Sequence, residues 1–269
     1  MYESTGATLL YNCETAALGP VLAPRFIPLH EDAALHTWLA WWRARPHGWL
    51  LGTLANLLSG YATSYDVHGL LGAYQMHLLS SQAWSELLQG QHAGTLLDVG
   101  AGAGYVTEGA RPLFERITCT ETSAALRKRL AKRGFEVLSN DLTDTPIARS
   151  FDVVSCFNVL DRTARPVSLL RQLARQLTVG GRLLVSMPLP PAPHVHVRGG
   201  TVTACERLPC SASSWEGAAR ELSEQLFAHV LEPMQMRLER LCRLPYLSRG
   251  DRAAPLYVLD AALWVFQRS

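Results

Sequence analysis

The sequence lacks an excess of either charge, and it lacks paired cysteines and long apolar runs. Its 269 residues hold 25 Lys and Arg against 23 Asp and Glu, so the formal net charge is only +2. This balance predicts no strong attraction to nucleic acid or to an anionic membrane surface. The six cysteines form no C-x-x-C pair, and a chain of this length does not need a disulfide scaffold.

No segment predicts a membrane span. The longest apolar stretch, residues 49–58, is about half of what a bilayer requires. The residues after Met1 lack the basic start and the apolar run of a signal peptide. We therefore expect a soluble, intracellular chain.

Short apolar runs alternate with helical segments from Thr95 onward. This alternation predicts parallel strands that are covered on both faces, and hence an α/β fold. We expect strands at 95–99, 117–120, 135–138, 151–157 and 182–186, followed by an antiparallel pair near 234–244 and 256–266. Helices are expected at 105–115, 123–133, 166–177 and from Ser213 or Ser214 to about Val230.

Two further regions frame this alternation. Residues 1–90 are predicted to be mostly helical, with helices at 30–43 and about 49–61 and a glycine-containing loop at 66–72. Residues 188–212 are rich in Pro, Gly and Cys and predict an irregular insertion. The interpretation is an N-terminal helical extension over 1–90 that contributes to the pocket of a Rossmann-like domain over 91–269.

A glycine-rich turn follows the first strand of the domain. The pattern Asp98-x-Gly100-x-Gly102-x-Gly104 lets the backbone approach a ligand closely and aim N–H groups at it. Glu121 ends the next strand, where an acid can accept hydrogen bonds from both ribose hydroxyls. Together they predict a nucleoside-bearing cofactor at the carboxyl ends of the strands. The alternative is a tight turn beside an acid that only faces solvent.

Polar residues also follow the strand at 151–157. Asn158 offers an amide donor and acceptor, and Asp161 offers a carboxylate. Side chains at this end of a parallel strand point into the ligand cleft. The alternative is that Asp161 caps a turn or pairs with Arg162.

Four segments resemble one family of methyltransferases. They are Leu96-Leu97-Asp98-Val99-Gly100-Ala101-Gly102, the run from Asp152 to Arg162, Arg243-Leu244-Pro245-Tyr246-Leu247, and Tyr257-Val258-Leu259-Asp260; Gly69-Leu70-Leu71-Gly72 also matches. From about Asp66 to its end, the chain resembles the DREV family, also called methyltransferase-like protein 9. The resemblance implies a class I S-adenosylmethionine-dependent fold, with a seven-stranded, mostly parallel sheet and an antiparallel C-terminal pair.

The resemblance also implies an activity and a substrate. The family methylates the Nπ of histidine in His-x-His motifs of proteins, giving 1-methylhistidine and S-adenosylhomocysteine. Its animal members are associated with endomembranes, although nothing in this chain encodes a compartment. Residues that would contact the cofactor are Asp98, Gly100, Ala101, Gly102, Gly104, Glu121, Asn140, Asp141, Asn158 and Tyr246.

Within that set, the resemblance assigns individual roles. Asp98 would face the methionine part, Glu121 the ribose, and Asn140 or Asp141 the adenine edge. Asp161, Asn158 and Tyr257 would hold the target imidazole.

The chemistry gives Asp161 a specific task. A neutral imidazole is already a nucleophile, but one nitrogen must present its lone pair while the other keeps its proton. A carboxylate that accepts the Nτ–H fixes that tautomer and stabilises the imidazolium that forms. Two alternatives stay open: methylation of a small imidazole compound, and a cofactor-binding interaction protein without turnover.

The chain contains a His-x-His of its own, His194-Val195-His196. Two histidines do not make a zinc centre, so no metal site is predicted. We expect these residues on a surface loop, with self-methylation as the alternative.

Overall fold

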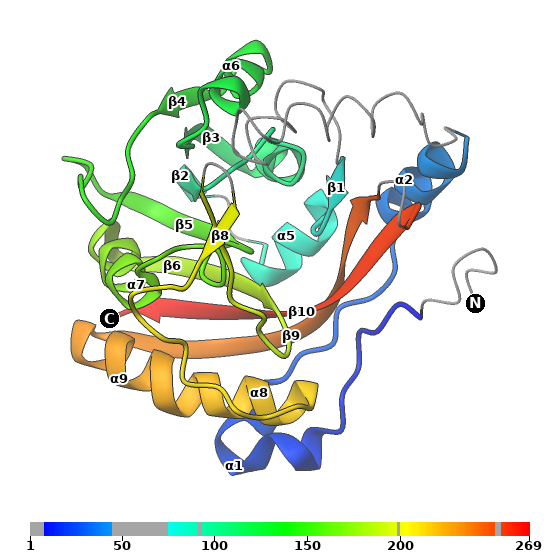
Figure 1. The fold of residues 1–269 in the computed structure, drawn as a ribbon, viewed down its shortest axis with the longest axis vertical. Coiled ribbons are helices and arrows are strands. Elements are labelled where there is room, and N and C mark those ends of the chain that lie inside the picture. Colours follow the sequence, from blue (N-terminus) through cyan, green and yellow to red (C-terminus); the bar gives the residue numbers. More distant parts are fainter. Residues whose placement is uncertain (1–7, 45–74, 91–92, 198–199, 251–253) are drawn as a thin grey trace.

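A computed structural model describes residues 8–44, 75–90, 93–197, 200–250 and 254–269. Its main feature is an eight-stranded sheet in the order β1-β9-β10-β6-β5-β2-β3-β4 (Figure 1). The strands are β1 (Met76–His77), β2 (Ala93–Val99), β3 (Phe114–Thr120), β4 (Glu136–Leu138), β5 (Phe151–Phe157), β6 (Leu177–Pro188), β9 (Met236–Arg249) and β10 (Leu256–Arg268).

The sheet confirms the predicted fold class. Strands β2 to β6 pair in parallel, β10 runs antiparallel to β6, and β9 runs antiparallel to β10. These are the seven expected strands, mostly parallel with an antiparallel C-terminal pair. The short β1 adds an eighth strand at the edge beside β9, which the sequence did not predict.

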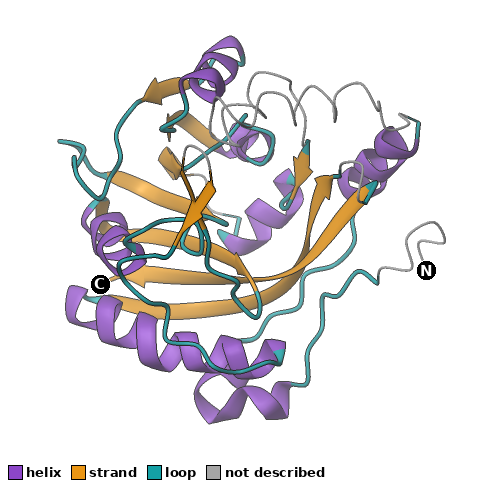
Figure 2. Cartoon of the chain, in the orientation of Figure 1, coloured by secondary structure: helices purple, strands orange, loops and turns teal. Residues whose placement is uncertain are grey.

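Helices cover both faces of this sheet (Figure 2). They are α1 (Gly19–Leu22), α2 (Ala33–Arg43), α5 (Ser81–Leu87), α6 (Ala124–Lys132), α7 (Pro166–Arg175), α8 (Trp215–Leu222) and α9 (Ala228–Leu231), with a π turn, η4 (Ser223–Phe227), between the last two. Single turns of 3-10 helix are η1 (Thr15–Leu18), η2 (Ala23–Arg25) and η5 (Glu232–Met234). Four helices begin where a side chain accepts a backbone N–H in the first turn, a stabilising cap. The caps are Asp32, Ser80, Ser123 and Ser214.

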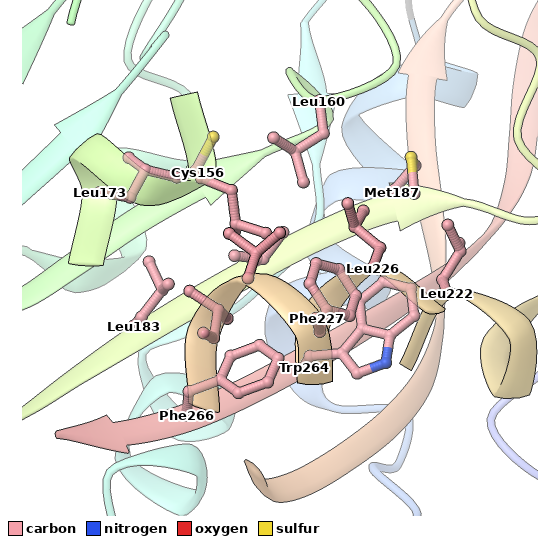
Figure 3. Close-up of a cluster of buried hydrophobic side chains, with 14 of the residues drawn as sticks. Cys156, Leu160, Leu173, Leu183, Met187, Leu222, Leu226, Phe227, Trp264 and Phe266 are labelled. Carbon is pink, nitrogen blue, oxygen red and sulfur yellow. The ribbon is translucent and has the colours of Figure 1, made fainter. Parts of the chain in front are cut away.

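The two faces of the sheet form two separate cores. Along β10, Trp264 and Phe266 pack with α7, α8 and α9, whereas Leu263 and Val265 pack with α5 and α6 on the other face. Figure 3 shows Trp264, Phe227 and Phe266 in the first core. Successive side chains of a strand point to opposite faces, so a strand buried on both sides is apolar throughout. The apolar cores on both faces stabilise the sheet. Polar residues therefore lie at the carboxyl ends of its parallel strands.

The helix predicted at 105–115 is wrong. The structure has instead the 3-10 helix η3 (Thr107–Leu113), and β3 begins at Phe114 rather than at residue 117. Pro112 lies inside η3 and has no N–H to donate, so an α-helical hydrogen-bond pattern cannot continue there.

The predicted insertion at 188–212 is irregular except for one small hairpin. Its strands are β7 (Val195–Val197) and β8 (Gly200–Val202). The helix expected at 49–61 and the loop at 66–72 lie outside the described residues. In the part of the chain that is described, no helix is both long and apolar enough to span a bilayer.

Candidate active site

The glycine-rich turn lies where β2 ends, against the segment that follows β5. Gly100 has a φ of 71°, and a Cβ built on it would lie 2.6 Å from Cγ2 of Val159. Only glycine combines this backbone angle with this close approach. The N–H groups of Gly100 and Ala101 donate to the carbonyl of Thr120, at 3.0 and 3.2 Å, which ties the turn to the end of β3.

Glu121 lies directly beside this turn, as the sequence predicts. Its carboxylate accepts the N–H of Gly102 at 3.0 Å and the N–H of Ser123 at 2.8 Å. Burial raises the pKa of this carboxyl, while the two backbone donors act in the opposite direction. Each carboxylate oxygen has further acceptor capacity, so Glu121 can also bind hydroxyl groups of a ligand.

Asp98 lies beneath the turn and is 3% exposed. Its carboxylate accepts the hydroxyl of Thr107 at 2.6 Å and that of Ser155 at 2.7 Å. Burial raises the pKa of Asp98 to about 6, against the opposing effect of these hydrogen bonds. The residue thus joins β2, η3 and β5 below the site.

Asn140 and Asp141 follow β4, and their side chains bind their own turn. The carboxylate of the exposed Asp141 accepts the N–H and the hydroxyl of Thr143, at 2.9 and 2.6 Å. The amide of Asn140 donates to the carbonyl of Thr145 at 3.2 Å. The N–H of Glu121 donates to the carbonyl of Leu138 at 3.2 Å, which brings the ends of β3 and β4 together.

Asn158 begins a sharp change of chain direction after β5. Its φ is 56°, in the left-handed region that a residue other than glycine seldom adopts. The buried Ser186 of β6 fixes it by two contacts. The N–H of Asn158 donates to the Ser186 carbonyl at 2.9 Å, and the Ser186 hydroxyl donates to Oδ1 of Asn158 at 3.3 Å. Backbone strain of this kind concentrates at functional sites.

Asp161 carries a buried carboxylate with one open oxygen. Its side chain is 2% exposed, and Oδ2 accepts Nε of Arg162 at 3.0 Å. Oδ1 is also buried, yet within the described residues it has no hydrogen-bond partner. Burial raises the pKa of Asp161, and Arg162 opposes this shift. The pairing with Arg162 that the sequence left open therefore exists, but it uses only one oxygen.

Tyr246 and Tyr257 share one face of the β9–β10 pair. Tyr246 lies opposite Leu259, and Tyr257 lies opposite Ser248, which in turn faces Met76 of β1. Residues opposite each other, or two apart on a strand, share a face. The Tyr246 hydroxyl contacts the sulfur of Met76, and Cε of Met76 lies 3.8 Å from the Cβ position of Gly102.

Met76 thus connects Tyr246 to the glycine-rich turn. The sequence did not predict a role for Met76 or for Ser186. A methionine after a loop carries no functional signal, and Ser186 is recognisable only from its pairing with the end of β5.

These residues fit an adenosine-bearing cofactor. Beside Gly102, in the described chain, a Cβ would meet only Met76 within 4 Å, so the turn leaves room at this point. Glu121 offers carboxylate oxygens next to that space, and Asp161, four residues after β5, has a buried carboxylate oxygen without a hydrogen-bond partner among the described residues. The acceptor oxygens of Glu121 match the chemistry of ribose hydroxyls, and the open oxygen of Asp161 matches that of an N–H group.

A family model described as DREV methyltransferase matches residues 10–268. The chain belongs to this family. Membership confirms the predicted resemblance, and with it a methyltransferase that uses S-adenosylmethionine.

More distant similarities accompany the family match. The chain is 30% identical over 99 residues to a ubiquinone biosynthesis O-methyltransferase of Xanthomonas oryzae pv. oryzae. This match covers 34% of the present chain. The chain spans 41% of the length of this curated relative.

Two solved methyltransferase structures are also similar. The N-methyltransferase NodS of Bradyrhizobium japonicum, in complex with S-adenosyl-L-homocysteine, has 16% identity and a TM-score of 0.45, covering 70% of this chain and 84% of its own. The magnesium protoporphyrin IX methyltransferase of Synechocystis, with bound SAM, has 13% identity and a TM-score of 0.46. The similarity covers 70% of this chain and 77% of the Synechocystis chain.

Proposed function

We propose that this DREV methyltransferase is a protein-histidine N-methyltransferase. It transfers a methyl group from S-adenosylmethionine to the Nπ of histidine in His-x-His motifs, and 1-methylhistidine is the product. The observation that carries the proposal is the open Oδ1 of Asp161. A buried carboxylate oxygen without a donor is costly, and an imidazole N–H would satisfy it.

The cofactor-binding residues lie around the glycine-rich turn. Gly100, Ala101, Gly102 and Gly104 form the close backbone approach, and Glu121 binds the ribose hydroxyls. Asp98 supports the turn on the methionine side. Asn140 or Asp141 faces the adenine edge, and Asn158 and Tyr246 complete the contacts. When bound, the cofactor supplies an electrophilic methyl group on a sulfonium.

The chain's own residues set the reactivity of the target. Asp161 accepts the Nτ–H of the imidazole, so the proton stays on Nτ and the lone pair of Nπ is free. As positive charge develops on the ring, the buried carboxylate stabilises it without reorganisation. Asn158 and Tyr257 orient the ring, because an in-line displacement depends mainly on alignment.

The N-terminal extension, residues 1–90, contributes to the same pocket. Met76 supports this part of the proposal, because it contacts Tyr246 and lies next to Gly102. Residues 91–269 form the methyltransferase domain. The partners are proteins or peptides with a His-x-His motif.

The test compares substrates and one substitution. Purified protein is incubated with labelled S-adenosylmethionine and a His-Ala-His peptide, a histidine-containing dipeptide, or no acceptor. We expect label in the peptide, on Nπ. Label only in the dipeptide would indicate a small-molecule enzyme, and binding of the cofactor without turnover would indicate an interaction protein.

Asp161→Asn tests the role of the carboxylate. The new amide NH₂ must face either the Arg162 N–H or the substrate N–H, and both are donors. We expect kcat to fall at least about 100-fold, with the affinity for S-adenosylhomocysteine kept within about 2-fold. Asp144→Asn, at an exposed carboxylate paired with Arg165, is the matched control. An unchanged kcat in Asp161→Asn would remove Asp161 from the mechanism.

A further inference from the structure

The insertion that contains the β7–β8 hairpin is fastened to the chain that follows Asp161. The N–H of His194 donates to the carbonyl of Asp161 at 2.9 Å. Further on, the carboxylate of Glu206 accepts the N–H and the hydroxyl of Ser168, at 2.8 and 2.5 Å. The insertion therefore runs along the segment from Asp161 to the first turn of α7. The hairpin lies between these two residues in the sequence, and its strand β8 is drawn in yellow in Figure 1.

A second contact between the same residues passes through side chains. Nε of Arg162 donates to Oδ2 of Asp161 at 3.0 Å, and Nη1 of Arg162 contacts Nε2 of His194. Asp161, Arg162 and His194 thus form a closed ring, with a backbone bond on one side and the guanidinium on the other. We call these three residues the Arg162 clasp.

The tautomer of His194 follows from its other contact. Nδ1 of His194 lies 2.8 Å from the carbonyl oxygen of Ala192. A carbonyl oxygen only accepts, so Nδ1 carries the proton and donates it. Nη1 of Arg162 can only donate, so Nε2 is the acceptor in their contact. The His-x-His histidine at this position is held with both ring nitrogens engaged.

The clasp determines where the open oxygen of Asp161 points. The donors of a guanidinium lie in one rigid plane, so an Arg162 held by both Asp161 and His194 has a fixed orientation. With Oδ2 fixed by Nε, the position of Oδ1 follows. The Arg162 side chain is only 28% exposed and its partner carboxylate is buried, so solvent screens this pair less than a surface ion pair.

We propose that His194 is a positioning residue for methyl transfer: it holds Arg162 so that Asp161 presents Oδ1 to the target imidazole. This inference rests on the proposed function of Asp161. Because both ring nitrogens of His194 are engaged in these contacts, His194 is not itself a methyl acceptor.

The experiment uses the full chain, the His-Ala-His peptide and two substitutions at one position. His194→Ala removes both ring contacts and keeps the backbone N–H. We expect kcat to fall roughly 10-fold, because a small displacement of a catalytic group has a large effect on rate. KM for the peptide and the affinity for S-adenosylhomocysteine should stay within about 2-fold. His194→Gln places an amide oxygen that can accept from Arg162, and it should recover most of kcat.

His229→Ala is the matched control. Its Nδ1 also contacts a main-chain carbonyl, that of Glu224 at 2.9 Å, but it lies on α9, away from the clasp. This variant should keep the wild-type kcat. Peptide mapping by mass spectrometry, after incubation with the cofactor, should find His194 unmethylated.

Four outcomes overturn the positioning role. They are a wild-type kcat in His194→Ala, no recovery in His194→Gln, an equal loss in His229→Ala, or a methyl group on His194. A wild-type protein that binds the cofactor and leaves the peptide unlabelled would instead refute the proposed function, and the positioning role with it. The two failures are therefore distinguishable.

Discussion

Replacing Gly100 by alanine tests whether the glycine-rich turn depends on its contact with the segment after β5. An added Cβ would lie 2.6 Å from Cγ2 of Val159, closer than carbon atoms approach in folded proteins. Val159 directly follows Asn158, so the displacement would reach a residue of the proposed site. We expect a loss of stability together with weaker binding of S-adenosylhomocysteine.

The expected loss of stability in Gly100→Ala has two contributions. Alanine at a φ of 71° costs about 1–2 kcal/mol, because the left-handed region disfavours a Cβ. Overpacking against Val159 adds about 1–3 kcal/mol. Gly180→Ala separates the two parts. Gly180 has a φ of 78° but, among described residues, no atom within 4 Å of the added Cβ, so only the backbone cost applies.

A double substitution isolates the contact. Val159→Ala removes both γ carbons and leaves its Cβ 3.7 Å from the added methyl, an ordinary contact. Urea denaturation of Gly100→Ala, Val159→Ala and the double variant should give a favourable coupling of about 1–3 kcal/mol. Calorimetric titration with S-adenosylhomocysteine should show affinity lost in Gly100→Ala and largely restored in the double variant.

A Gly100→Ala variant destabilised no more than Gly180→Ala would refute the contact between the added Cβ and Val159. Strictly additive effects of Gly100→Ala and Val159→Ala would refute it equally, because they would show that the two side chains do not meet.

Two further predictions concern the buried acids of the site. Burial raises the pKa of Asp98 from 3.8 to about 6, so the folded protein keeps a proton that the unfolded chain releases. Stability should therefore fall by about 3 kcal/mol in total as pH rises from well below 4 to well above 6, with about 2 kcal/mol of this loss between pH 4 and pH 6. Asp98→Asn should flatten this dependence in urea titrations, and an unchanged slope would contradict the assignment. Glu121→Gln should raise the dissociation constant for S-adenosylhomocysteine roughly 10- to 100-fold, the equivalent of about 1.5–3 kcal/mol. The exposed Glu115→Gln on β3 is the control for calorimetry, and equal affinities in the two variants would refute a role for Glu121.

The strands of the sheet other than β1, and the polar residues that follow them, could be predicted from the sequence. Residues 261–266 of β10 are buried on both faces, and this burial appears in the sequence as an uninterrupted apolar run. Gly100, Glu121 and Asn158 each follow a parallel strand, and the carboxyl ends of parallel strands share one edge of the sheet. Their proximity therefore follows from strand order alone.

The conformations of short turns were not predicted from the sequence. The segment before β3 has the composition of a helix, yet Pro112 cannot donate the hydrogen bond that an α-helix would need there. A Cβ added to Gly109 would lie 2.6 Å from the carbonyl oxygen of Leu79, a tertiary contact that the sequence does not reveal. Asn140 and Asp141 were predicted as site residues because they follow the strand at 135–138. Their side-chain hydrogen bonds to the following turn depend on the path of the chain after β4.

Contacts between segments that are distant in the sequence depend on the three-dimensional fold. Met76 reaches Tyr246 because a two-residue strand joins the sheet edge in one register. Arg162 and His194 are 32 residues apart in the sequence, and they meet because the insertion after β6 folds back over the end of β5. Periodicity in a sequence reports which face of an element is buried, whereas contacts between side chains of separate elements depend on strand register and loop path, which no local pattern encodes.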